Sequence, residues 1–410
     1  MSENVLGVDM DSKGFQCVLI DPGTNKSVKR KYLNMERTLM SFLSWIKNND
    51  SPIICIEGKN GYSLPLESFL HENKYPFYSI SSKQVKKFRE SFVSENKDNE
   101  KDAEAVARLG LALYQQNQLD AYRAIADDKT LIEIRQFSRI EQKETERRTE
   151  SVNVLWHSIH YASSELYLFL KGFNPDSNNE NNIIQNKGIL NLLADRPDLT
   201  EWKNLSYEDI FNSMGGQKYK GRDALAKSLM EIAPNIKSIS PSIKTAIRLY
   251  ANQIKAQDKV ISELEKEQER LSEGDTIIED MIKYKGIGCK TASAIRGEIM
   301  NPLRFKNDDH LASYAGFGMK KVATGNTVKM VPNSSYNRRL KNAFMTAAKN
   351  LIAHGQRDGG DKHLCAYFRD LKKNQKLNPT EAYKRVARSW LRITQRRWKV
   401  AIKRRESEMA

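Results

Sequence analysis

The sequence predicts two fold classes in one chain of 410 residues, α/β at the N-terminus and all-α in the remainder. Short apolar runs rich in β-branched residues alternate with amphipathic stretches up to about residue 120, and helical periodicity dominates after that point. This change of pattern, together with the length, predicts three domains, with boundaries at 1–125, 126–275 and 276–410.

The first expected element is a β-hairpin in VLGVDMDSKGFQCVLID, residues 5–21. Two apolar runs flank a short polar turn that contains Gly14. Asp9 lies where the first strand ends, and a carboxylate at the edge of a buried strand is costly unless something binds it. Asp9 therefore either caps the turn or binds a metal ion, and the hairpin alone does not decide between the two.

The next elements continue the alternation. A third strand is expected near Val28–Leu33 and an amphipathic helix over Glu36–Trp45. The apolar run PIICIEG, with the acid Glu57 at its end, is typical of a central buried strand. A helix over Leu64–Leu70, the strand YPFYSI and a helix from Ser82 follow. Three leading strands and then alternating helices and strands are the order of an RNase H-like sheet.

The middle of the chain is expected to form long helices. Residues 131–170 contain neither Pro nor Gly, so they predict one helix of about 60 Å. Residues 172–221 predict a tip of short helices. Apolar residues over 243–271 recur with steps of four and three, which predicts a coiled coil. Its partner is either the 131–170 helix or a second protomer, and Gln257 and Gln268 in the seam would help to fix the register.

The charge of the chain favours a polyanionic partner. Lys and Arg number 67 against 51 Asp and Glu, a formal charge of +16. Because each neutralised phosphate releases counterions, nucleic acid is the expected partner. No stretch approaches the roughly 20 apolar residues of a spanning helix, and the N-terminus passes at once into DMDSK, without a signal peptide's apolar region. We therefore expect a cytoplasmic, nucleoid-associated protein with no membrane partner. The four cysteines have no zinc-ligand spacing.

The basic C-terminal part contains a glycine turn between two expected helices, in YKGIGCK. Gly286 and Gly288 allow unusual backbone angles, and Lys285 and Lys290 flank the unpaired N–H groups of the following helix. Such a turn is either a phosphate-binding helix-hairpin-helix or an ordinary helix-helix turn.

Other basic residues of this part are candidates for phosphate contact. The last helix, from Thr380, is expected to bury the face of Tyr383, Val386, Trp390, Ile393 and Val400. Its opposite face carries Arg388, Arg392 and Arg396, which either contact phosphate or form a solvated surface. Four further candidates precede it: Lys320, Lys321, Arg338 and Arg339.

Acidic residues from distant parts of the chain are expected at one edge of the sheet. Asp9 and Glu57 end two strands, and Asp98 and Asp102 lie four apart on one helix face. Hard oxygen ligands of this kind hold Mg²⁺ or Mn²⁺ with positions left open for phosphate. Acids in a first helical turn also suit the helix dipole without any metal.

Seven motifs, in this order, resemble the insertion-sequence transposases with a DEDD RuvC-like domain: GVDMD, CIEGKNGY, KDNEKDAEAVA, YKGIGCKTASAI, FKNDDHLASYAGF, TGN and NRRLKNAFMTAA. That family includes the bridge-RNA-guided recombinases and the Piv-type DNA invertases, and the resemblance covers essentially the whole chain. It implies a RuvC-like domain, a long coiled-coil insertion and a mainly helical C-terminal DNA-binding and catalytic domain. It also implies dimers that pair into a synaptic tetramer, double-stranded donor and target DNA, and a structured guide RNA.

The resemblance also assigns the acids. Asp9 matches the first, Glu57 the second and Asp102 the fourth, but Asn99 stands where the family has its third. Since Asn brings no charge, metal affinity should fall unless Asp98 replaces it.

The family's nucleophilic serine falls on Thr324, whose extra methyl group crowds in-line attack on phosphorus. Three functions stay open. The leading one is a metal-dependent recombinase that uses Thr324. The others are a transposase-derived DNA- or RNA-binding protein, and a RuvC-like nuclease in which water attacks.

Overall fold

The computed structural model describes residues 3–57, 62–91, 99–124, 129–172, 183–215, 222–236, 239–324, 327–333, 336–358 and 361–409. The chain divides into two compact units, Met1–Asp127 and Asp128–Ala410. We call the first the sheet unit and the second the helical unit.

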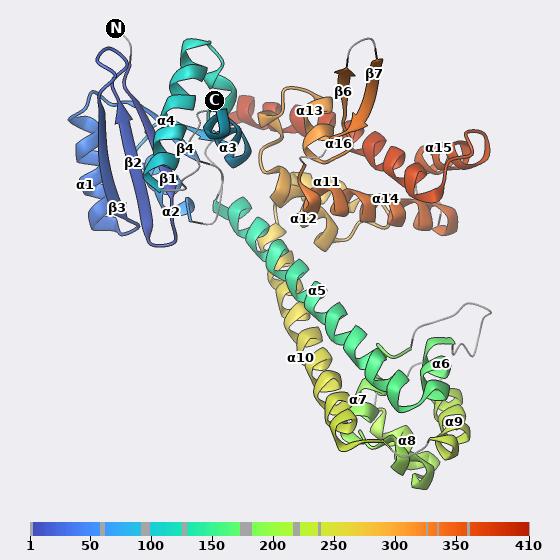
Figure 1. Cartoon of the computed structure of the whole chain (residues 1–410). Coiled ribbons are helices and arrows are strands. Elements are labelled where there is room, and N and C mark those ends of the chain that lie inside the picture. Colours follow the sequence, from blue (N-terminus) through green and yellow to red (C-terminus); the bar gives the residue numbers. More distant parts are fainter. Residues whose placement is uncertain are drawn as a thin grey trace. The chain divides into compact units, whose positions relative to one another are not determined.

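The sheet unit contains one five-stranded sheet (Figure 1). Its strands are β1 (Val5–Met10), β2 (Gly14–Ile20), β3 (Ser27–Leu33), β4 (Ile53–Glu57) and β5 (Phe77–Ile80), in the spatial order β3-β2-β1-β4-β5. The first three strands are antiparallel, whereas β4 runs parallel to β1 and β5 parallel to β4. This is the RNase H-like order that the sequence predicted.

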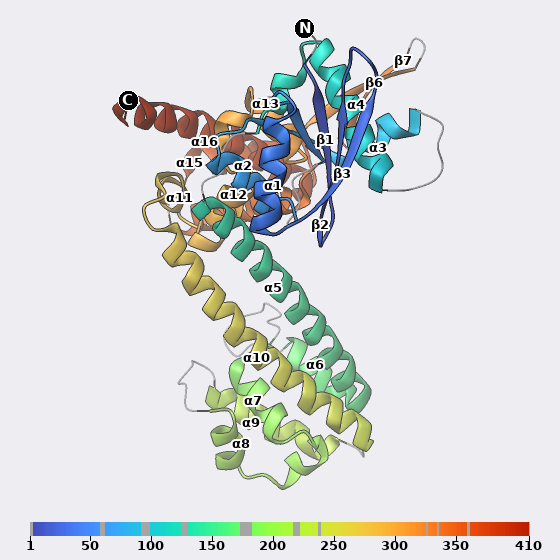
Figure 2. The same ribbon diagram turned by 90° about the vertical axis from the view of Figure 1, so that its left-hand side faces the viewer.

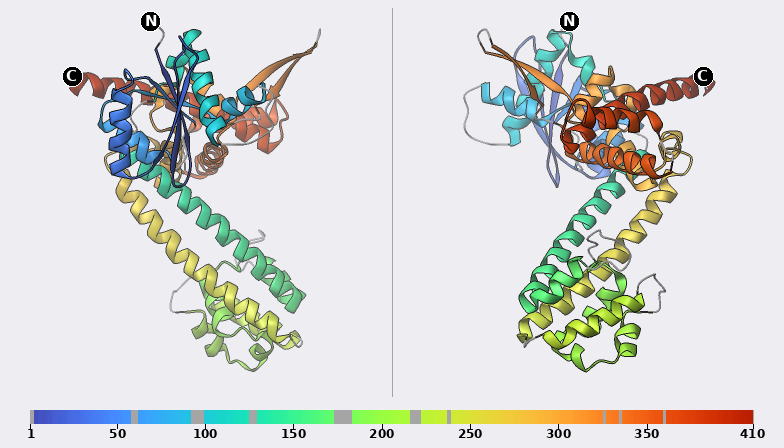
Figure 3. Two further views of the ribbon diagram at one scale, coloured as in Figure 1. Left: turned by 60° about the vertical axis from the view of Figure 1, so that its left-hand side comes forward. Right: turned by 90° about the vertical axis from the view of Figure 1, so that its right-hand side faces the viewer.

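Helices cover both faces of this sheet (Figure 3). On one face lie α1 (Glu36–Lys47) and α2 (Leu64–Glu72), and on the other lie α3 (Ser82–Ser91) and α4 (Asn99–Gln115). Successive residues of β1 point to opposite faces, so Leu6 and Val8 pack with α1 and α2, whereas Val5 packs toward α4. A 3-10 turn, η1 (Leu119–Tyr122), ends the unit.

The helical unit contains a stalk of two long helices, α5 (Lys129–Ala162) and α10 (Pro241–Ser272), which pack along each other (Figure 2). Ile247 and Ile254 of α10 are fully buried there. Of the two partners left open for the heptad pattern, α5 is therefore the one that this chain itself supplies. A second core lies at the far end of the stalk, formed with α6 (Ser164–Gly172), α7 (Lys187–Asp195), η2 (Leu199–Asn204), α8 (Tyr207–Ser213), α9 (Arg222–Ile232) and η3 (Ala233–Asn235).

The single helix expected over 131–170 is wrong, because the helix is interrupted at Ser163, between α5 and α6. The Ser163 hydroxyl accepts a hydrogen bond from the Leu166 backbone N–H at 3.2 Å, and so opens a new helix. Serine competes with the helical backbone in this way, even where neither Pro nor Gly is present.

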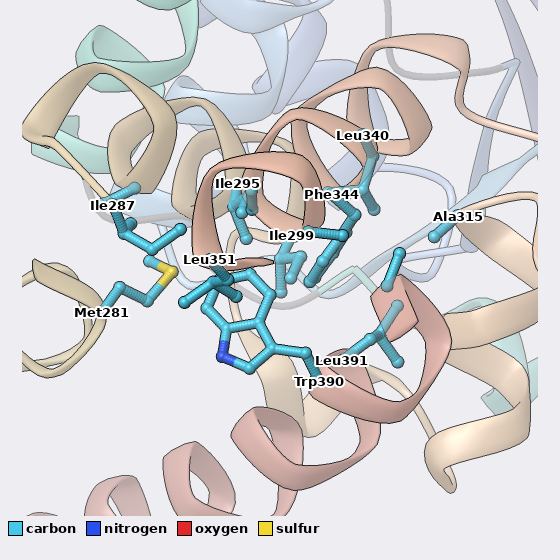
Figure 4. Packing of buried hydrophobic residues seen from close by; sticks show 14 of the residues in the cluster. Met281, Ile287, Ile295, Ile299, Ala315, Leu340, Phe344, Leu351, Trp390 and Leu391 are labelled. Atoms are coloured by element: carbon cyan, nitrogen blue, oxygen red, sulfur yellow. The ribbon is translucent and has the colours of Figure 1, made fainter. Parts of the chain in front are cut away.

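The C-terminal part of the helical unit has its own core. Its elements are α11 (Thr276–Ile282), α12 (Cys289–Ile299), η4 (Pro302–Arg304), α13 (Asp308–Tyr314), the hairpin of β6 (Met319–Thr324) and β7 (Thr327–Pro332), α14 (Arg338–Asp358), α15 (Lys362–Lys373) and α16 (Pro379–Met409). Figure 4 shows Phe344 and Trp390 in this core, with ring centroids 5.6 Å apart. The division of the helical unit into a stalk domain and a C-terminal domain stays a prediction.

The buried face predicted for the last helix is wrong in its second half. Ile393 is 45% exposed and Val400 is 68% exposed, whereas Thr394 is fully buried. The Thr394 hydroxyl donates to the Trp390 carbonyl at 2.9 Å, so the core tolerates a polar residue that a hydrophobicity pattern assigns to the surface.

Among the described residues, no helix is both long enough and apolar enough to cross a membrane.

Candidate functional site

Two acids lie side by side where adjacent parallel strands end. Val8 of β1 pairs with Ile56 of β4, and the next residues along are Asp9 and Glu57. Parallel neighbours are about 4.8 Å apart, and both residues fall on the sheet face that α4 covers. The apolar runs before them bury the strands, so the two carboxylates are held at the edge of the core.

A third acid reaches this edge because α4 packs very closely on the sheet. A Cβ at Gly7 of β1 would lie 2.2 Å from the Ala103 carbonyl oxygen and 2.3 Å from the Ala107 nitrogen. Only glycine permits this approach of helix to strand. Asp102 precedes Ala103, so the same contact brings its carboxylate toward Asp9.

The electrostatics of Asp9 show that the three acids act on one another. The pKa of Asp9 is raised to about 7, first by burial and then by the negative charges of Glu57 and Asp102. A hydrogen bond from the Met10 backbone opposes this rise only in part. Like charges gathered in a partly buried place disfavour ionisation, and a bound cation would relieve that repulsion.

Sequence reasoning missed one cation here. Arg89 of α3 forms an ion pair and a hydrogen bond with Asp102, and both side chains are largely buried. The signal for it was weak, because Arg89 is one of four basic residues in SKQVKKFRES. The pair joins α3 to α4 and neutralises one of the three carboxylates.

The donor chemistry of the three acids fits a hard divalent cation such as Mg²⁺ or Mn²⁺. No three His, Cys, Asp or Glu side chains of the described ranges already converge as a set of metal ligands. Of the remaining predicted ligands, Asp98 lies outside the described residues, and Asn99 is the first residue of α4, its side chain outside the description.

The helical unit places the predicted nucleophile at the end of a β-hairpin. Thr324 is the last residue of β6 and pairs with Thr327, the first of β7. Lys320 and Lys321 precede it on the same strand, and the side chains of all four residues lie outside the description. Figure 3 shows this hairpin projecting from the helices that carry it.

A buried polar network joins the helices that flank the hairpin in the sequence. Asn337 donates to Glu298 at 2.7 Å and to the Tyr314 hydroxyl at 3.0 Å. Arg139 of α5 binds both oxygens of Glu298, at 2.6 and 2.9 Å. Burial opposes ionisation of Glu298, but the hydrogen bonds from Arg139 and Asn337 outweigh it and hold its pKa below the usual value. The network therefore ties the stalk to the helices on either side of the hairpin.

A basic groove of about 810 Å³ adjoins the start of the hairpin. Its walls come from Gly316–Met319, α14, α15 and α16. Among the described residues that line it, six are basic and Glu381 is acidic; the basic ones are Lys341, Lys384, Arg385, Arg388, Arg392 and Arg396. A positive concavity of this size suits a phosphodiester chain.

Three of these arginines are paired with two acids of α13. Arg392 binds Asp309 at 2.6 Å, Arg388 binds it at 3.3 Å, and Arg396 binds Asp308 at 2.6 Å. The Asp309 side chain is 64% exposed, and exposed ion pairs contribute only about 0–1 kcal/mol. A phosphate could therefore take the place of the aspartate at little cost.

The glycine turn between α11 and α12 has a packing role. Gly286 has a φ of +97°, and a Cβ there would lie 2.8 Å from the Asn350 carbonyl of α14. Gly288 is the N-cap of α12, and a Cβ there would meet open space. Lys285 lies in the turn, whereas Lys290 pairs with Glu141 and Glu265 of the two stalk helices. The Lys290 pairs were not expected from the sequence.

Arg338 and Arg339 open α14 and are exposed. Arg339 lines a smaller cavity of about 190 Å³ between α5, α12 and α14, which also contains Lys290. Arg139 and Glu298 of the Asn337 network also line this cavity, so Arg339 lies beside that network.

Two family models match the chain. The first, described as a transposase with a DEDD domain, covers residues 6–158, and the second, described as transposase IS116/IS110/IS902 family, covers residues 281–363. The first match contains Asp9, Glu57 and Asp102, and the second contains the glycine turn, the hairpin and the whole of α14. No curated protein matches the chain.

Proposed function

The chain belongs to the IS110 family of transposases with a DEDD domain, which recombine DNA, and from this premise we propose how its residues cut and rejoin DNA strands. The carboxylates of Asp9, Glu57 and Asp102 hold a divalent cation, Mg²⁺ or Mn²⁺, with Asp98 or Asn99 as the remaining ligand. The single observation that carries this proposal is the register of β1 and β4, which end side by side at Asp9 and Glu57. The raised pKa of Asp9, to which the charges of Glu57 and Asp102 contribute, supports the same grouping. When bound, the cation lowers the charge of the scissile phosphate and the pKa of the attacking hydroxyl.

The attacking group in this proposal is the hydroxyl of Thr324. The hydroxyl gives up its proton to a carboxylate of the acid cluster, and its oxygen forms a bond to phosphorus. The bond from phosphorus to the leaving 3′ oxygen breaks, and that oxygen takes up a proton. The products are a phosphothreonyl link and a free 3′ hydroxyl. The supports are the position of Thr324, which pairs with Thr327 at the turn of the hairpin, and the family pattern, in which the acids of one protomer meet the hydroxyl of another.

The basic groove and the exposed cations of α14 bind the DNA backbone in this proposal. Contacts of this kind position DNA without reading its sequence. Choice of sequence would then fall to a structured RNA that pairs with donor and target, as in the bridge-RNA branch of the family. The support is the formal charge of +16, which suits more than one nucleic-acid strand. Sequencing of the RNA that co-purifies with the protein tests it, and an absence of one enriched structured RNA would contradict it.

The remaining parts of the proposal concern organisation. The stalk of α5 and α10 is a coiled-coil insertion, the glycine turn is part of a helix-hairpin-helix, and the three domains have the boundaries given above. The protein forms dimers that pair into a tetramer on DNA. Mass measurement in solution, with and without DNA, distinguishes these states.

A suicide substrate separates the three functions that the sequence leaves open. The DNA carries a phosphorothiolate at the junction and is incubated with the protein and Mg²⁺. A covalent protein–DNA product that is lost in Thr324→Ala supports the recombinase. Cleavage without a covalent product supports a nuclease that uses water, and binding with neither product supports a DNA-binding protein.

A further inference from the structure

The register of the sheet extends the row of Asp9 across two more strands. Asp9 of β1 pairs with Gln16 of β2, and Gln16 pairs with Lys31 of β3. Residues directly opposite each other in antiparallel strands point to the same side of the sheet. Asp9, Gln16 and Lys31 therefore form one row on the face that α4 partly covers, and two strand spacings separate Asp9 from Lys31 by about 10 Å.

From Asp9 to Lys31, the residues of this row are less and less covered by α4. Val18 of β2 packs beneath Ala103 and Ala107 of α4. Gln16 is only half buried, and Lys31 is exposed. The sheet face beside the acids is therefore partly open to solvent, and it carries the neutral amide of Gln16 and then the charge of Lys31.

The other face of β3 is used differently. Tyr32 stacks on Phe15, with ring centroids 5.4 Å apart, and the guanidinium of Arg30 lies 5.2 Å from the centre of the Trp45 ring. Arg30 and Lys31 are therefore neighbours of like charge, one on the packed face of the strand and one on the open face.

We propose that Gln16 and Lys31 bind the DNA backbone next to the phosphate at the acids, a subsite that deepens the proposed function and rests on it. The three carboxylates repel the negatively charged phosphates of a DNA strand that approaches them. The Gln16 amide can donate a hydrogen bond to a phosphate oxygen, and Lys31 adds a positive charge on a flexible stem. Because that charge lies near one Debye length of about 8 Å from the acids at physiological salt, the acids only partly cancel it.

The alternative role for Lys31 is purely protective. Lysines on an edge strand prevent other sheet edges from pairing with it. That role requires no particular face, so Lys31 and the equally exposed Arg30 would then be equivalent in DNA binding.

The experiment compares the full-length variants Lys31→Gln, Lys31→Arg and Arg30→Gln, each first checked for unchanged thermal unfolding. Affinity for a labelled single-stranded DNA of mixed sequence is measured in EDTA across a range of salt concentrations. We expect Lys31→Gln to reduce the slope of log affinity against log salt by about 0.7, the share of one phosphate contact on a single strand. Lys31→Arg and Arg30→Gln should leave the slope unchanged.

Equal slopes of log affinity against log salt for Lys31→Gln and Arg30→Gln would overturn the proposal. So would a reduced slope in Lys31→Gln that is found with RNA of the same sequence but not with DNA. Gln16→Ala adds an independent reading, since it should weaken DNA binding about equally at all salt concentrations. These binding measurements contain no metal and need no cleavage. The subsite can therefore fail while the suicide substrate is still cut, and it can stand if no cleavage occurs.

Discussion

The acid cluster of the sheet unit and the basic groove of the helical unit concentrate charges of opposite sign. In the acid cluster, three carboxylates from two strands and a helix are held close together, and Arg89 neutralises one of them. In the groove, three arginines from a single helix are already paired with Asp308 and Asp309. In the first site the neighbouring negative charges and burial raise the pKa of Asp9, whereas in the second exposed ion pairs hold the arginines only weakly.

The difference follows from how each site is built. In the acid cluster, the close backbone contact of α4 with Gly7 sets the position of the helix that carries Asp102. The groove depends on long, partly exposed side chains that can change partners. This difference agrees with the proposed roles, a metal site at the acids and a backbone-binding surface in the groove.

The largest effect is expected where the acid cluster loses a charge. Glu57→Gln keeps the shape of the side chain but removes a carboxylate of the proposed metal site, so cleavage of the suicide substrate should slow by about 10³-fold. Single-turnover cleavage at saturating Mg²⁺ measures this. Glu36→Gln, which removes an exposed acid of α1, is the matched control and should cut at the normal rate. Equal rates for the two variants would remove Glu57 from the site.

The next effect concerns the contact that builds the acid cluster. Gly7→Ala puts a methyl group 2.2 Å from a backbone oxygen of α4, so the helix must move. We expect a loss of about 1–3 kcal/mol in the free energy of unfolding, as for other overpacked cores. Urea denaturation measures it, with Gly23→Ala as control because its nearest atom would be 3.3 Å away. A stability equal to that of the control would show that the helix adapts freely.

The groove should respond to loss of charge in its salt dependence. Replacing both Arg388 and Arg392 by Gln removes two phosphate contacts, so the slope of log affinity against log salt for duplex DNA should fall by about 2. Arg397→Gln is the control, since Arg397 lies on the same helix but pairs with Asp280 and Tyr284. An unchanged slope in the double variant would mean that the groove does not contact DNA.

The fold of the sheet unit was predictable because its signals are local. Short apolar runs between amphipathic stretches predicted the order of strands and helices, and Asp9 and Glu57 were chosen because each follows an apolar run. Arg89 was not predictable, since its pairing with Asp102 depends on how two helices pack. The residues that follow Glu57 lie outside the described part of the chain, and so does Asp98. The full set of metal ligands therefore stays a prediction.

The helical unit was less predictable because the periodicity of apolar residues carries no information about side-chain hydrogen bonds. The break at Ser163 depends on one hydroxyl, and the buried Thr394 depends on another. The heptad pattern indicated a helical partner for α10 but not which helix it would be. Lys290 was expected to contact phosphate from its place beside the glycines, yet it pairs with acids from distant parts of the chain.

The pH dependence of stability should differ between the protein and Asp9→Asn. Because the pKa of Asp9 is about 7 in the fold and near 3.9 when unfolded, the unfolded chain releases this proton first. In EDTA, stability should therefore fall as pH rises from about 4 to about 7, and Asp9→Asn should lessen that fall. Denaturation at several pH values measures it. Parallel curves for the two proteins would show that Asp9 ionises normally, and added Mg²⁺ should offset the fall in the unmodified protein alone.

The smallest effect has the opposite sign and tests the groove from its other side. Asp309→Asn removes the acid that holds Arg388 and Arg392, so both should bind phosphate without first breaking an ion pair. Since each exposed pair is worth about 0–1 kcal/mol, duplex DNA should bind only a few times more tightly. Anisotropy titration at moderate salt measures this, with Asp370→Asn on α15 as the control of equal charge. A weaker affinity would mean that Asp309 positions the arginines for DNA instead of competing with it.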